Sequence, residues 1–159
     1  MRGLYESMET SPRLESQGIW LDLGHTRIRL GRAGGKNTKF IAAAERVARE
    51  HKRSLDLMSE EQGRKLFAKI FAEIIVLDWL TKTKDGELDE EGNAITDEKF
   101  EGDRYVKGIQ RRGGEVVEFN VENVIKTFDD LPDLLKMVKE TAEDSSLFRQ
   151  SLLEGIEGN

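Results

Sequence analysis

The segment that comes nearest to a catalytic loop is GRAGGKNT at residues 31–38, which is rich in glycine and contains one lysine. It lies between a predicted strand and a predicted helix, the context in which backbone N–H groups and a lysine bind nucleotide phosphates. The spacing does not fit that chemistry. A phosphate-binding loop needs a glycine where this chain has Leu30, and a hydroxyl residue after Lys36, where it has Asn37. The sequence therefore predicts a glycine-rich turn without a nucleotide.

Two other groups of residues raise the question of a metal site. Residues 85–103 contain nine acidic side chains and one lysine, and Ca²⁺ prefers clustered carboxylate oxygens. The nearest approach to an EF-hand loop, however, has Glu90 where glycine is required. His25 and His51 are the two histidines, and their spacing is not typical of a metal site. We therefore assign no metal, no cofactor and no catalytic residue, and expect a protein that is not an enzyme.

Composition restricts the protein classes that fit. The chain has 159 residues, enough for one domain, of which 37% are hydrophobic and 35% charged. It has no cysteine, so disulfides and thiolate chemistry are excluded. A net charge of −6 argues against a dedicated nucleic-acid-binding protein. No apolar run approaches the roughly 20 residues that cross a bilayer, and no signal region is apparent at the N-terminus, so we expect no membrane contact and a cytoplasmic location.

A basic run between His25 and Phe40 contains five positive residues and no acidic one: Arg27, Arg29, Arg32, Lys36 and Lys39. It favours a solvated or self-paired face, with a protein-binding patch as the next interpretation. Aromatic side chains for stacking on bases are nearly absent, which disfavours nucleic acid. We expect self-association in which this run of one copy meets the acidic segment 85–103 of the next.

The elements that must position these residues follow from periodicity. Residues 1–17 lack apolar periodicity and are predicted to be a flexible lead-in. Residues 18–159 are predicted to form a single domain with an acidic loop at 85–103. Alternating apolar residues on both sides of Gly24 and His25 predict a hairpin, and Asn37 or Thr38 is expected to cap the helix that follows.

The remaining pattern is mostly helical. Ser59 and Gln62 form a capping box before a long apolar run that continues through Trp79, which predicts a central helix. A second short hairpin is predicted around Arg111–Gly113, and later helices begin after Asn120, at Pro132 and at Ser146. The predicted fold class is α+β and mainly α-helical, with a small N-terminal β-hairpin and about four to five helices.

Three segments occur in an order that is similar to one protein family. They are a strand pair with an Arg-Ala-Gly turn and a helix from about Phe40, an apolar helix ending at Asp78-Trp79, and a capped helix that reaches Leu131-Pro132 before Phe148-Arg149. The chain in this respect resembles the tail assembly chaperones of long-tailed, siphovirus-type bacteriophages. The resemblance spans roughly residues 18–152 and rests on the joint order of the segments.

The resemblance implies a factor of the host bacterial cytoplasm that is absent from the finished virion. Such proteins bind the helical tape measure protein, maintain its solubility and help to recruit tail tube protein. The family also often makes a longer form by ribosomal frameshifting. Two alternatives from other classes stay open: a small structural virion protein of the tail or head-tail connector, and, third, a nucleic-acid-binding module.

A protein that covers the apolar face of a helical partner needs apolar side chains at its own surface. The candidate partner contacts lie on the predicted central helix and near the C-terminus: Phe71, Trp79, Leu147, Phe148 and Leu152. Burial in the protein's own core is the competing interpretation for each of them.

Overall fold

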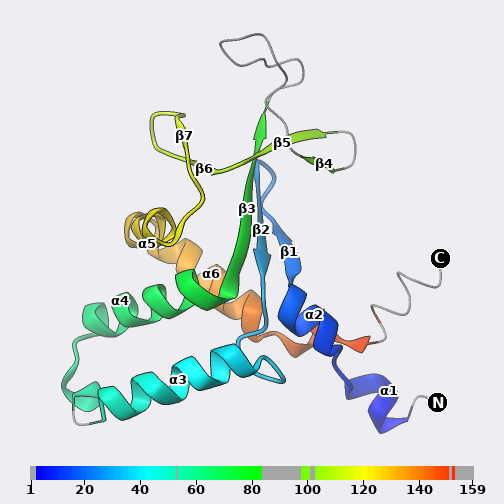
Figure 1. Ribbon diagram of the computed structural model, residues 1–159, viewed down its shortest axis with the longest axis vertical. Coiled ribbons are helices and arrows are strands. Elements are labelled where there is room, and N and C mark those ends of the chain that lie inside the picture. The colour runs from blue at the N-terminus through cyan, green and yellow to red at the C-terminus, as the bar shows by residue number, and fades with distance from the viewer. Residues whose placement is uncertain (1–2, 53, 84–97, 101–102, 151, 153–159) are drawn as a thin grey trace.

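An antiparallel sheet forms the frame of the molecule in the computed structural model, which describes residues 3–52, 54–83, 98–100, 103–150 and 152 (Figure 1). Its strand order is β1-β2-β3-β5-β4. The strands are β1 (Ile19–Asp22), β2 (Thr26–Leu30), β3 (Val76–Thr83), β4 (Glu98–Phe100) and β5 (Asp103–Lys107). A two-stranded sheet of β6 (Ile109–Gln110) and β7 (Val116–Val117) follows.

Helices precede, interrupt and follow the sheet in the chain. They are α1 (Leu4–Met8), α2 (Pro12–Gln17), α3 (Thr38–Glu50), α4 (Glu60–Ile70), α5 (Val121–Asp130) and α6 (Pro132–Glu143). Shorter helical turns are η1 (Leu55–Leu57), the π-helical η2 (Phe71–Ile75) and η3 (Ser145–Phe148). In Figure 1, α3 and α4 extend together from one end of the β2–β3 pair, and β4 and β5 lie at the other end.

The expectation of a mainly helical domain with a small attached hairpin is wrong, because a sheet occupies the centre. The predicted central helix through Trp79 ends in η2 at Ile75, and the chain continues as β3, which pairs with both β2 and β5. Val76, Trp79 and Leu80 are all buried. A strand buried on both faces is apolar at nearly every position, and periodicity alone does not separate such a run from a buried helix.

The N-terminal hairpin lies where the sequence predicts it, but it is part of the larger sheet. β1 pairs with β2 in the register Leu21↔Ile28, and β2 pairs with β3 in the register Ile28↔Trp79. Asp22 accepts a hydrogen bond from the Gly24 backbone N–H at 2.9 Å, which stabilises the turn. The hairpin therefore places β2 between β1 and β3 in the sheet.

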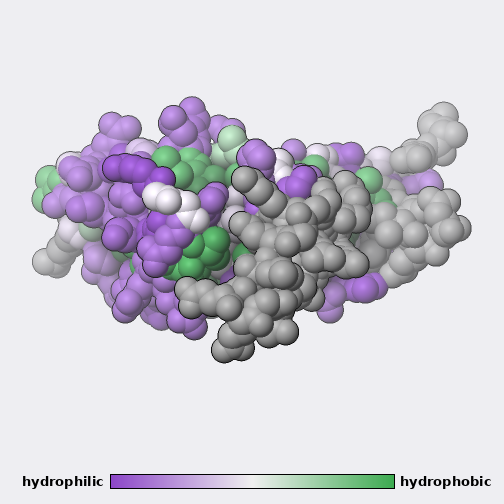
Figure 2. All heavy atoms as spheres, turned by 90° about the horizontal axis from the view of Figure 1, so that it is seen from above, coloured by the Kyte–Doolittle hydropathy of each residue, from purple (hydrophilic) through white to green (hydrophobic). Residues whose placement is uncertain are grey.

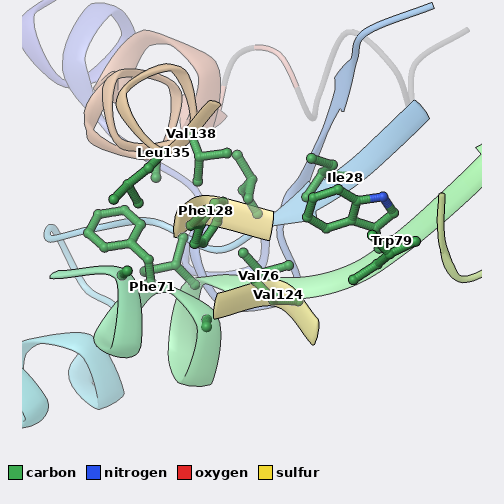
Figure 3. Packing of buried hydrophobic residues seen from close by; sticks show 14 residues of the cluster. Ile28, Phe71, Val76, Trp79, Val124, Phe128, Leu135 and Val138 are labelled. Atoms are coloured by element: carbon green, nitrogen blue, oxygen red, sulfur yellow. The ribbon is translucent and has the colours of Figure 1, made fainter. Parts of the chain in front are cut away.

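The hydrophobic core lies between β2–β3 and the helices α4, α5 and α6 (Figure 3). Ile28 and Trp79 come from the sheet, and Phe71 comes from the π-helical turn. Val124 and Phe128 of α5 fill the space between them together with α6 residues. Full burial of such side chains contributes about 1.5–3 kcal/mol each, so this interface holds the helices on the sheet.

The segment 1–17, predicted to be a flexible lead-in, contains the short helices α1 and α2 within its described residues. Ser11 caps α2 by accepting a hydrogen bond from the Leu14 N–H, and its own backbone N–H donates to Phe148 O at 2.8 Å. Thr10 forms an isolated antiparallel bridge with Arg149. Backbone hydrogen bonds to the C-terminal segment hold this part of the chain in place. Such bonds leave no apolar periodicity in the sequence, so the hydrophobic pattern did not predict α1 and α2.

Other predicted boundaries agree with the structure. The capping box of Ser59 and Gln62 begins α4, Asn120 caps α5, and Pro132 is the first residue of α6. The second hairpin is present as β6–β7. Of the acidic segment 85–103, residues 85–97 and 101–102 lie outside the described residues, and residues 98–100 form β4 in place of part of the predicted loop.

Candidate helix-binding surface

The glycine-rich turn that resembles a phosphate-binding loop binds a carboxylate side chain of the same protein. The carboxylate of Glu15 accepts a hydrogen bond from the Lys36 backbone N–H at 2.6 Å and another from the Arg32 guanidinium at 3.1 Å. Glu15 is fully buried, and a Cβ on Gly35 would lie 2.5 Å from its Oε1 atom. The turn therefore anchors α2, and glycine is required where the carboxylate approaches the backbone.

The predicted basic patch is divided by the fold. Arg27 pairs with Asp22 at 3.2 Å and lies over the Tyr105 ring, Arg29 lies over Trp20, and Arg32 binds Glu15 and lies over Phe148. Only the two lysines of the five residues, Lys36 and Lys39, are exposed. The three arginines consequently support the fold, and the two lysines lie exposed just before and at the start of α3.

The five predicted partner contacts are also divided by the fold. Phe71, Trp79 and Phe148 are buried in the core, with exposed fractions of 3% or less. Leu147 and Leu152 are 36% and 46% exposed. The three aromatic residues therefore stabilise the domain, and of the predicted set only the two leucines remain available at the surface.

An apolar groove runs between α3 and α4. Its volume is about 170 Å³, and its lining residues are all hydrophobic: Ala44, Val47, Ala48, Leu66, Phe67 and Ile70. Two alanines and a valine line the α3 side of the groove, and α4 supplies its larger side chains. Figure 2 shows hydrophobic residues reaching the surface between hydrophilic ones on the face seen from above.

A second, larger groove of about 970 Å³ lies between α4 and the start of α6. Phe67, Phe71, Pro132 and Leu135 supply its apolar part. Its rim carries both signs of charge, from Glu60, Glu61, Arg64, Asp133, Lys136 and Lys139. Phe67 lines this groove as well as the first, so one side chain forms the wall between the two.

Phe67 is the central residue of this surface, although it is not among the partner contacts predicted from the sequence. It is 47% exposed, although its ring centroid lies 6.5 Å from the buried ring of Phe71. Lys139 Nζ lies 5.4 Å from the centroid of the Phe67 ring on the α6 side. The sequence offered one signal, the spacing of Phe67 and Phe71 by four residues, but only packing decides which of the two is buried.

The two grooves have the properties of a peptide-binding surface. The first groove is lined by hydrophobic residues, and the second combines an apolar part with charged lining residues, which together suit the apolar stripe and polar flanks of an amphipathic helix. Among the described residues, no group of three or more His, Asp or Glu side chains is placed to hold a metal ion. The arrangement supports binding of an apolar side-chain row and contains no assembled acid, base or nucleophile that we identify.

Known proteins provide no family assignment. Comparisons with models of protein families, with curated proteins and with solved structures gave no match to this chain. In the described part of the chain, each helix is too short or too polar to span a membrane.

Proposed function

We propose that this chain is a phage tail assembly chaperone, a protein-binding factor without catalytic activity. In this role it binds the tape measure protein in the bacterial cytoplasm, maintains its solubility and promotes assembly of tail tube protein around it. The observation that carries the proposal is the half-exposed Phe67 between two grooves that have apolar bases. The order of sequence motifs supplies the identity of the partner.

The grooves suit a helix that presents apolar residues every three to four positions. Such a helix lays one apolar row along α4 and covers Phe67, and each buried Å² of apolar surface contributes about 25 cal/mol. The charges at the rim of the larger groove can pair with polar flanks of the same helix. This mode of binding needs neither a cofactor nor a conformational change of the sheet.

Co-expression with the tape measure protein encoded in the same genome tests the proposal. We expect the tape measure protein to become soluble and to copurify with this chain. The variant Phe67→Gln should abolish copurification, because glutamine retains helix propensity but removes the apolar wall between the grooves. Tyr5→Gln is the matched control, since Tyr5 is an exposed aromatic residue of α1 away from both grooves.

Two results would contradict the proposal. One is a tape measure protein that stays insoluble with the wild-type chain; the other is copurification that Phe67→Gln and Tyr5→Gln reduce equally. The first result would favour a structural virion protein. Presence of the chain in purified particles would then identify that class.

A further inference from the structure

A basic cavity lies on the face of α3 that is turned away from the apolar groove. Its volume is about 820 Å³, and four cationic side chains line it: Lys36, Lys39, Arg46 and Arg49. Ala42, Ala43, Ile74 and Leu77 form an apolar base. Two of the four cations belong to the predicted basic run, and two come from further along α3, where helical periodicity brings them to the same side.

The electrostatics of the basic cavity favour a negatively charged occupant. Glu73 is the single acidic residue of its lining, and within the described ranges none of the four cationic side chains makes an ion pair. α3 begins at Thr38 beside the cavity, so the positive end of its dipole adds to the same potential. All four cations are exposed and accessible to a partner.

The chemistry of the lining favours an acidic protein segment over nucleic acid. Among the described residues, no aromatic side chain lines the cavity on which a base could stack. The apolar base formed with Ile74 and Leu77 instead suits an aliphatic side chain. A matching occupant combines carboxylates with one exposed apolar residue.

The turn between α5 and α6 has this combination, and we call it the acidic corner. Asp129, Asp130 and Asp133 are exposed around Leu131, which is itself 52% exposed. None of the three carboxylates forms an ion pair with a described residue. Two backbone hydrogen bonds fix the turn: the Leu131 N–H donates to Thr127 O at 2.9 Å, and Leu131 O accepts from the Leu134 N–H at 3.0 Å.

We infer that a second copy of this chain inserts its acidic corner into the basic cavity. Leu131 of one copy then contacts the apolar base of the cavity in the other copy, and the carboxylates of the corner lie against the four cations of the cavity. The corner is preorganised by two helices, so docking orders few additional residues and costs little conformational entropy. Corner and cavity are built from different elements, so one copy can offer them to different neighbours. The inference does not depend on binding of a tape measure protein.

A complementation experiment tests the inference with purified full-length chains. We expect the wild-type mass, measured by sedimentation, to rise with concentration at low salt and to fall as salt rises from about 0.1 M to about 1 M. The cavity variant Arg46→Gln/Arg49→Gln and the corner variant Asp129→Asn/Asp130→Asn should each weaken self-association at least about tenfold. An equimolar mixture of the two variants should form one-to-one dimers, because one intact corner meets one intact cavity.

Controls separate this contact from others. Lys65→Gln/Lys69→Gln removes two exposed cations of α4 that lie outside the cavity and should leave self-association unchanged. Glu90→Gln/Glu91→Gln tests the acidic segment 85–103, and loss of association in this variant alone would overturn the choice of the corner. A monomeric wild type at every concentration, or a mixture that stays monomeric, would also overturn the inference. A third result would overturn it as well: the wild type binds a fluorescent single-stranded DNA and the cavity variant does not, while the cavity variant self-associates to the same extent as the wild type.

Discussion

Arg32 Nη1 lies 3.1 Å from Glu15 Oε1, and the side chain of Glu15 is only 1% exposed. This ion pair joins α2 to the glycine-rich turn, and the turn in turn contacts α6 through the hydrogen bond from Ala33 N–H to Ala142 O. A buried carboxylate needs such partners, because its charge is otherwise costly to remove from water. One pair therefore links the N-terminal segment to the C-terminal half of the domain.

Replacing Glu15 by alanine should destabilise the protein by about 3 kcal/mol, because the guanidinium of Arg32 loses its partner in a largely buried site. We also expect faster proteolysis at Arg13, since α2 loses its anchor. Urea unfolding and limited trypsin digestion measure the two effects. Glu6→Ala, at an exposed position of α1, is the control and should change stability by less than about 0.5 kcal/mol. Equal stability of the two variants would show that the ion pair does not anchor α2.

Two glycine substitutions should have opposite effects. Gly18 has φ of 89°, and a Cβ there would lie 2.7 Å from Leu30 O, so Gly18→Ala should cost at least about 1 kcal/mol. Gly63 lies inside α4 with open space around it, so Gly63→Ala should stabilise the protein by up to about 1 kcal/mol. Thermal unfolding of both variants checks the signs. Destabilisation by Gly63→Ala would contradict the placement of this residue within a helix.

Trp79 and Leu152 should separate a core role from a surface role. Trp79 is 3% exposed between the sheet and the helices, so Trp79→Ala should destabilise the domain by about 3–5 kcal/mol. Leu152 is 46% exposed, and Leu152→Ala should change stability by less than about 0.5 kcal/mol. Denaturant unfolding measures both changes in stability, with far-ultraviolet circular dichroism as the signal because it does not depend on tryptophan fluorescence. A small effect at Trp79 would argue against β3 as a buried strand.

The pKa of Asp144 should lie below its usual value of 3.8. The largest cause is the hydrogen bond from Ser146 Oγ at 2.6 Å, followed by the Ser146 backbone N–H at 3.0 Å. Because the folded-state pKa is depressed, the ionised carboxylate stabilises η3 fully above pH 3.8, and this stabilisation is lost as pH falls through the lower folded value. Ser146→Ala should raise the pKa of Asp144, which an NMR titration of the carboxyl carbon detects. An unchanged titration would exclude the hydroxyl as the main cause.

The sequence predicts those structural features correctly that depend on contacts between residues close together in the chain. The capping box at Ser59, the Asn120 cap and Pro132 at the start of α6 depend on side chains within one turn of the helix they begin. The β1–β2 hairpin follows from alternation around a short turn, for the same reason. These features therefore required no knowledge of distant contacts.

The tertiary structure alone decided which surfaces are free. The sequence pattern places Trp79 in a helix, and only the pairing of β3 with β2 and β5 shows that it lies in a strand. The pattern likewise indicates a surface cation at Arg32, and only the fold places Glu15 beside it. Phe67 and Phe71 lie four residues apart, yet contacts of η2 with α5 and with Phe40 of α3 bury Phe71, whereas Phe67 is left exposed. The amino-acid sequence by itself determined the charge balance, the absence of cysteine and the starts of α4, α5 and α6. Burial and ion pairing depend on residues far apart in the chain, so only the assembled fold could determine the candidate binding surfaces.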